Sequence, residues 1–570
     1  MLRSPAVWRR LPAGLLCGLL AAAGCGSAPP APPPDISLVL TNGRIWTNDP
    51  EEPWTEALAI ADGRIVATGG SDAISALAGD AESINLRRGL VLPGFIDTET
   101  DLFGPDLPGE VIDLSSARSR RQLVSLVRTA AEGHAPGAWL IGRGWDHRQW
   151  GDRPPHRSWL DDETPDHPVW LLQRDGELGL ANSLALERAG ISDATSGARL
   201  DADGLELSGL LEGVALAQLR ASLPAPSDAA RDRSLAAALR LAAEQGVTSV
   251  HHLGRWEDLE RLRRADQEGR LTARVYAAVP LADWLQLDLA IGAGQFGERG
   301  GRGHGRVRVG AVHATLDGSV VARSAAFHEP YTLAGDDSGR LSDPSEPLMR
   351  ALQGADRADL QILLRATGDR AVSAALDLQS ALPDARQRLR RFRIDGAHHI
   401  RPADLARFGL EGVLAGGRPF ATLHEGRWVG QELGPERART SFPFRALLDA
   451  GARLTFGSGR LDQGSPLDGI YAAVTRRTLD GLHPLGWIPE ERISVADAID
   501  AYTGAAAFAG FSEDAEGRLT VGRYADLILV DRDLLSVDAN DIPLVRVIMT
   551  VVGGDIVFDE RPSFLLDEIN

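Results

Sequence analysis

The pattern of apolar and polar positions divides the chain into β-rich ends and an alternating middle. Short β-rich runs separated by turn residues occupy 37–45, 57–67 and 82–92, and similar runs return at 517–530 and 545–558. Runs of this kind, bounded by Gly, Asn and Asp, are typical of strands. We expect the two ends, residues 36–92 and 515–570, to pair into one small β-rich domain.

Between these ends, strand-like apolar runs alternate with helical patterns. The strand candidates are 90–96, 246–252, 273–279, 306–314, 360–366, 391–397, 412–416 and 453–457. Eight strands alternating with helices predict an α/β fold, a (β/α)8 barrel of the TIM type, over residues 93–514. The stretch from about 100 to 240 is too long for one crossover, so we expect an insertion after the first strand.

The first 35 residues have the character of an export signal followed by a tether. A positively charged start precedes an apolar run at 11–23 that is too short to span a bilayer, which predicts a signal peptide over 1–25. The run ends Ala22-Ala23-Gly24-Cys25, which resembles a bacterial lipobox, and residues 26–35 are rich in Pro and Ala. We therefore expect an exported lipoprotein of the cell envelope, attached to the membrane only through a lipid on Cys25. A plain cleaved signal with an incidental cysteine is the alternative.

Composition narrows the possible partners and metal ligands. The 570 residues are 44% hydrophobic, enough for a large buried core, and the net charge of -19 argues against nucleic acid. We expect a small-molecule ligand or a protein partner instead. The chain has no lysine, so all 60 basic residues are arginine. Its cysteines are Cys17 and Cys25, so any metal in the folded body must be held by His, Asp or Glu.

A set of short motifs, in order along the chain, carries a family resemblance. The motifs are Val-Leu-Pro-Gly-Phe-Ile-Asp at 91–97, Gly-Arg-Gly-Trp-Asp at 142–146, Asn-Ser at 182–183, Gly-Val-Thr-Ser-Val-His at 246–251, Asp-Gly-Ser at 317–319, Gly-Asp-Arg-Ala-Val at 368–372 and Gly-Arg-Tyr-Ala-Asp-Leu at 522–527. Together they resemble the amidohydrolase superfamily, in the branch that contains N-substituted formamide deformylase. The resemblance implies a metal-dependent hydrolase of carbon-nitrogen bonds other than peptide bonds, in which bound divalent ions activate water.

The same resemblance implies six metal-ligand positions, and all six carry other residues. Glu99 and Asp101 stand for a His-x-His pair, His313 for a lysine, Arg365 and Gly396 for two histidines, and Gly459 for an aspartate. In addition, Glu177 stands where the family has a histidine that contacts substrate. We therefore expect no metal cofactor, and a pseudoenzyme that binds a small molecule or partner at the barrel mouth.

Alternative interpretations of the same pocket stay open. The pocket candidates are Glu99, Asp101, Glu177, His251, His313, Arg365, Asp395 and His398. An active hydrolase could hold one divalent metal ion through Glu99, Asp101 and His313, with His251 as a further candidate. Metal-free acid-base catalysis could use Glu99, Asp101 or Glu177.

One distance tests the metal-free interpretation. Two uncompensated carboxylates on one strand end would repel each other. We therefore expect the Arg365 guanidinium to lie within about 4 Å of a carboxylate oxygen of Glu99 or Asp101, the range of an ion pair.

Overall fold

A computed structural model of the chain describes residues 35–104, 111–151, 154–174, 176, 178–296, 305–332, 335–342, 346–383 and 387–561. The expected signal peptide, the lipobox with Cys25 and the pocket candidate Glu177 lie outside the described residues. Among the described helices, none has both the length and the apolar character that a membrane crossing requires.

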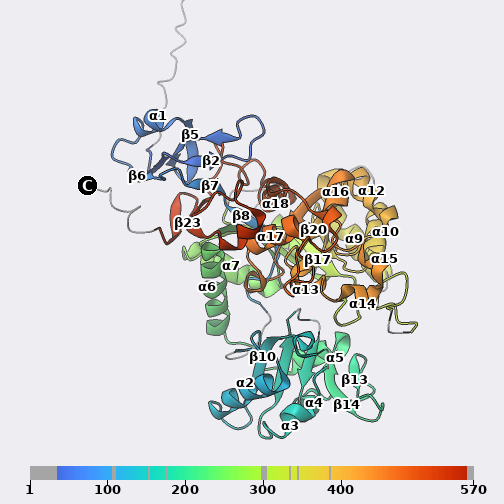
Figure 1. The fold of residues 1–570 in the computed structure, drawn as a ribbon. Coiled ribbons are helices and arrows are strands. Elements are labelled where there is room, and N and C mark those ends of the chain that lie inside the picture. Colours follow the sequence, from blue (N-terminus) through green and yellow to red (C-terminus); the bar gives the residue numbers. More distant parts are fainter. Residues whose placement is uncertain are drawn as a thin grey trace, which may run out of the picture. The chain divides into compact units, whose positions relative to one another are not determined.

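Eight parallel strands form the central sheet, and neighbours in the sheet follow one another in chain order. Helices lie around these strands (Figure 1). The strands are β8 (Phe95–Thr100), β15 (Val247–Leu253), β16 (Arg274–Pro280), β17 (Val307–Thr315), β18 (Gln361–Arg365), β19 (Arg393–Asp395), β20 (Leu414–Gly417) and β21 (Arg453–Phe456). A parallel bridge between Thr100 and Gly459 links the first strand to the segment after the last one. The predicted barrel fold is therefore confirmed.

Helices between and after these strands surround the barrel. They are α6 (Asp228–Glu244), α7 (Trp256–Gln267), α8 (Trp284–Gly292), α9 (Glu346–Arg357), α10 (Asp369–Ser380), α11 (Gln387–Arg390), α12 (Pro402–Glu411), α13 (Ala421–Glu425), α14 (Val429–Leu433), α15 (Pro435–Ala438), α16 (Phe444–Asp449), α17 (Pro466–Thr475), α18 (Val495–Ala501) and α19 (Gly504–Ala509). Strand residues such as Val312, Leu364 and Ile394 are fully buried in the largest apolar cluster. This packing holds the carboxyl ends of the strands, where barrel enzymes place their chemistry, in a fixed arrangement.

The first predicted strand, 90–96, is in fact two strands divided at Gly94. The segment Leu90–Pro93 forms β7, which joins the β-rich sheet, while Phe95 begins the barrel strand β8. A Cβ atom at Gly94 would lie 2.2 Å from Thr248 Cγ2, so a larger residue does not fit where the chain passes from one sheet to the other.

Strands from both chain ends share one sheet, as expected. The six-stranded sheet has the order β24-β23-β22-β7-β2-β3, and a four-stranded sheet has the order β5-β4-β1-β6. Their strands are β1 (Leu38–Thr41), β2 (Arg44–Trp46), β3 (Trp54–Thr55), β4 (Ala57–Ala61), β5 (Arg64–Gly69), β6 (Glu82–Asn85), β22 (Leu527–Val530), β23 (Val547–Val552) and β24 (Asp555–Asp559), with the helix α1 (Ser71–Ser75). The two chain ends meet where β22 pairs antiparallel with β7, with Leu527 opposite Pro93.

The segment between β8 and β15 contains a sheet of its own. Its order is β13-β14-β12-β11-β10-β9. The elements are β9 (Val111–Asp113), β10 (Leu140–Trp145), β11 (Val169–Gln173), β12 (Gly179–Ala181), β13 (Ala198–Leu200), β14 (Leu207–Leu211), α2 (Arg120–Glu132), α3 (Ser158–Asp161), α4 (Ser183–Ala189) and α5 (Gly213–Ser222). The last helix before β15, α6, packs against β15 and β23.

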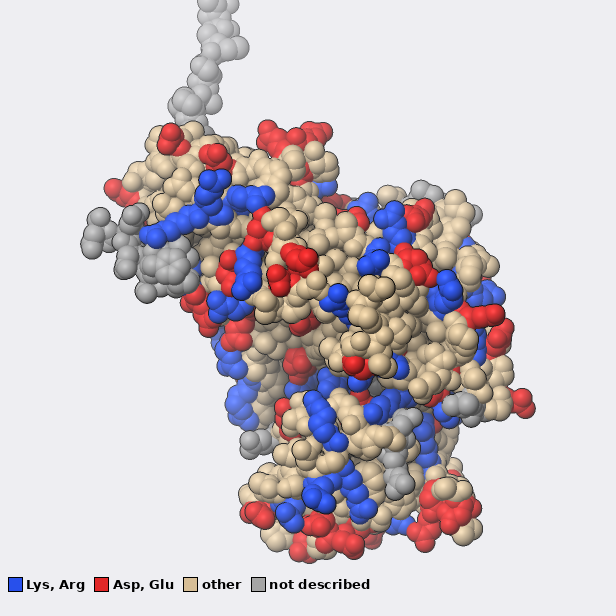
Figure 2. Space-filling model, in the orientation of Figure 1, with Lys and Arg blue, Asp and Glu red and all other residues tan. Residues whose placement is uncertain are grey.

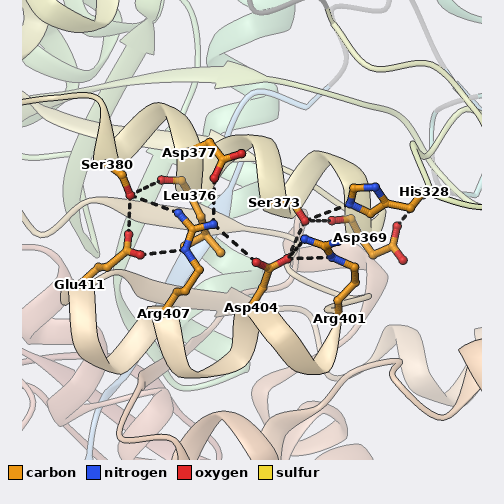
Figure 3. Close-up of polar contacts among 10 residues, drawn as sticks. All are labelled: His328, Asp369, Ser373, Leu376, Asp377, Ser380, Arg401, Asp404, Arg407 and Glu411. Atoms are coloured by element: carbon orange, nitrogen blue, oxygen red, sulfur yellow. Dashed lines mark hydrogen bonds and ion pairs between the residues drawn. The ribbon is translucent and has the colours of Figure 1, made fainter.

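A polar network joins α10 and α12 in the outer layer of the barrel (Figure 3). The Ser373 hydroxyl lies 2.5 Å from an Asp404 carboxylate oxygen and 3.2 Å from His328 Nε2. Both the aspartate and the histidine contact the serine itself. In a hydrolytic triad the aspartate would instead hold the histidine. We therefore interpret this network as a clamp between two helices.

Candidate functional site: the barrel mouth

A cavity of about 480 Å³ opens at the carboxyl ends of the barrel strands, and residues of the insertion complete its wall. Its charged lining comprises Glu99, Asp101, Asp113, Asp462, His313, Arg143, Arg174, Arg220, Arg365, Arg418 and Arg460. Figure 2 shows blue side chains gathered around a hollow on the face in view. The site is thus rich in arginine although the chain as a whole is acidic.

Glu99, at the end of β8, faces two guanidinium groups. Its Oε1 lies 3.9 Å from Arg365 Nε and its Oε2 lies 3.6 Å from Arg418 Nε. Glu99 is only 6% exposed, so water screens these ion pairs weakly. The contact expected between Arg365 and Glu99 is therefore present, and Arg418 adds a second one.

Two glycines leave the room in which these arginines lie. A Cβ atom at Gly459 would come within 3.1 Å of Arg418 Nη1. At Gly396, which has a φ of +67°, a Cβ atom would lie 3.6 Å from both Arg365 Cγ and Arg418 Nη2. An aspartate at 459 or a histidine at 396 would therefore compete with the guanidinium groups for the same space.

Asp101 and His313 line the cavity but have contacts of their own. Asp101 Oδ1 lies 3.9 Å from His252 Nδ1. His313 Nε2 lies 2.9 Å from the carbonyl oxygen of Gly254, which can only accept, so this nitrogen carries the proton and donates. Burial lowers the pKa of His313, which favours the neutral ring. Within the described residues, no group of three or more His, Cys, Asp or Glu side chains is placed to hold a metal ion.

His251 and Asp395 belong to a buried network inside the barrel. Arg393 Nη1 lies 2.8 Å from His251 Nδ1, and Arg393 also binds Asp395 at 2.7 and 2.8 Å. Burial raises the pKa of Asp395 to about 6, although Arg393 opposes the shift. This contact gives His251 the structural partner expected of a buried histidine.

His398 lines a second, smaller chamber of about 110 Å³. Arg174, Arg365 and Arg418 line both cavities, so the chamber borders the mouth. His398 is 2% exposed, and neither of its ring nitrogens has a hydrogen-bond partner. Burial lowers the pKa of His398 well below its usual range, so the ring is neutral. Phe420, His424 and Trp428 form other parts of the lining.

Sequence reasoning missed Arg418 and Arg174. Arg418 directly follows β20, a strand to which the resemblance assigns no ligand. The signal available was its place at the carboxyl end of a barrel strand. Arg174 directly follows β11 in the insertion, and the signal available was Glu177 three residues later, at a position that the resemblance places against substrate.

Comparisons with known proteins agree with this architecture. Residues 82–558 match the sequence profile of the amidohydrolase family. The protein LONG AFTER FAR-RED 3 of Arabidopsis thaliana is 32% identical over 92% of both chains. N-substituted formamide deformylase of Arthrobacter pascens is 24% identical over 92% of this chain and 99% of its own. Among solved structures, an uncharacterised metal-dependent hydrolase of Pyrococcus furiosus is 25% identical, covers 88% of this chain and 100% of its own, and superimposes with a TM-score of 0.68.

Proposed function

The chain belongs to the amidohydrolase family, and we propose that it is a member that binds a small molecule at the barrel mouth without metal-dependent hydrolysis. The observation that carries this proposal is the position of Glu99 between Arg365 and Arg418. Arg365 stands at a position where the resemblance implies a metal ligand, and it brings a permanent positive charge to Glu99.

The donor set does not fit a divalent ion. Such an ion needs several lone pairs that converge on one point. Here the carboxylate of Glu99 is shared between two guanidiniums, and His313 directs a proton-bearing nitrogen at Gly254. Arg365 and Arg418 would in addition repel a cation. Hydrolysis by a metal-activated water therefore has no support at this site.

Elemental analysis of protein purified without added metal tests the proposal. We expect much less than one metal ion per chain, no change in thermal midpoint on addition of a chelator, and no hydrolysis of a panel of amides and cyclic imides with or without zinc. Stoichiometric metal, together with hydrolysis that the chelator abolishes, would contradict the proposal. That result would favour a hydrolase with a rearranged metal site that includes Glu99, Asp101 and His313.

We also propose that the protein is a membrane-attached lipoprotein of the cell envelope. The support is the charged start, the short apolar run and the small residues before Cys25. A lipid on Cys25 would hold the chain at a membrane by acyl insertion alone.

A further inference from the structure

Arg174 is a partly buried cation that lines both cavities of the barrel mouth. Its Nε is buried and has no hydrogen-bond partner, and within the described part of the chain no carboxylate forms an ion pair with it. Burial lowers the pKa of Arg174, although Asp146 opposes the shift. An arginine keeps its charge under such conditions, so its burial without a partner costs free energy. A bound anion would offset that cost.

Carboxylates near this cation are engaged with other arginines. Asp146, whose charge acts most strongly on Arg174, forms an ion pair with Arg427 at 3.6 Å. Asp462 is already in contact with both Arg143 and Arg460, and Glu99 is shared by Arg365 and Arg418. The charge of Arg174, which none of these ion pairs neutralises, favours a ligand with a negative group.

The smaller chamber, which Arg174 also lines, has aromatic residues in its wall. Phe420 and Trp428 supply aromatic surface, and His398 supplies a neutral ring whose nitrogens have no partner. Its volume of about 110 Å³ suits a body no larger than one ring or a short branched chain. Because Arg174 lines both cavities, a group bound to its guanidinium can extend into the chamber.

We propose that the ligand is a small carboxylic acid, with its carboxylate on Arg174 and its apolar body beside His398, Phe420 and Trp428. This inference rests on the proposed function, that the mouth binds a small molecule. A guanidinium can donate two parallel hydrogen bonds to a carboxylate, which gives orientation as well as affinity. His398 can in addition donate to, or accept from, a polar substituent on the body.

Isothermal titration of the full-length protein in detergent tests the ligand class with three probes. Phenylacetate carries the charge and a ring, phenylacetamide carries the ring without the charge, and inorganic phosphate carries the charge without the ring. We expect phenylacetate to bind at least ten times more tightly than either of the other two. An equal affinity for the amide, tighter binding of phosphate, or no binding of any probe would overturn the proposal.

Arg174→Gln tests whether Arg174 binds the carboxylate of the ligand. The matched control is Arg263→Gln, on the exposed face of α7. We expect Arg174→Gln to weaken phenylacetate binding at least tenfold and to leave the thermal midpoint of the free protein unchanged or higher, because a buried unpaired charge is removed. Arg263→Gln should leave the affinity unchanged. Unchanged affinity in Arg174→Gln would overturn the assignment. Metal content, measured on the same preparations, shows separately whether the metal-free proposal holds.

Discussion

At the barrel mouth, the carboxylate of Glu99 forms ion pairs with both Arg365 and Arg418. If Arg365 were the sole partner of Glu99, its removal would cost roughly 3 to 5 kcal/mol. With two partners and a 26% exposed Arg365 side chain, Arg365→Gln leaves Glu99 paired and should cost about 1 kcal/mol. Glu99→Gln removes the buried carboxylate that both guanidinium groups face and should cost about 3 kcal/mol. Urea unfolding at pH 7 measures both.

Glu244→Gln is the control for these variants, because its pair with Arg240 lies on the solvent face of α6 and should be worth less than about 0.5 kcal/mol. A loss for Arg365→Gln as large as that for Glu99→Gln would show that Arg418 does not share the charge.

The sequence predicted only some of the individual residues of the site. Glu99 and Arg365 occupy positions that the resemblance marks, so their contact could be predicted from charge alone. Arg418 and Arg174 lie at strand ends without a marked role, and in a chain whose basic residues are all arginine no single arginine stands out. Their roles depend on which side chains the fold brings together.

The pair of helices α10 and α12 depends on one buried carboxylate (Figure 3). Asp404 is 3% exposed and binds Ser373 and Arg401, with Arg407 at 3.5 Å. Asp404→Asn removes the charge that these groups face and should lower the free energy of unfolding by about 2 kcal/mol, measured by urea unfolding.

The matched control is Glu346→Gln, which removes an exposed ion pair with Arg350 on α9 and should change stability by less than about 0.5 kcal/mol. Ligand binding at the mouth should be the same in both variants. Equal free energies of unfolding for the Asp404→Asn and Glu346→Gln proteins would mean that the clamp between α10 and α12 does not stabilise the fold.

The elements themselves were largely predictable, because apolar runs and turn residues mark them locally. The eight barrel strands and the pairing of the chain ends agree with the pattern. The division at Gly94 was not predictable from the pattern. Residues 90–96 are apolar on both sides of Pro93 and Gly94, so the segment has the pattern of a single strand. The close approach of Thr248 that requires the glycine arises only when the strands pack.

For the whole molecule, the proposed lipid anchor predicts where the protein is found. Changing Cys25 to alanine, or treating cells with globomycin, should move the protein from the membrane fraction to the soluble one, because the acyl chains are its only proposed attachment. Immunoblots of fractionated cells measure this, and Cys17→Ala is the matched control. Unchanged fractionation of the Cys25→Ala protein would contradict lipidation.

The pairing of Leu527 with Pro93 has a consequence for the order in which the protein folds. Residues 36–93 are synthesised before residues 527–530. Until β22 forms, β7 therefore lacks a hydrogen-bonded neighbour on one side. Contacts between such distant segments close slowly, and an open strand edge invites pairing with other chains. The strand β7 is therefore made long before its neighbour β22, and its open edge needs protection from aggregation until residues 527–530 can pair with it.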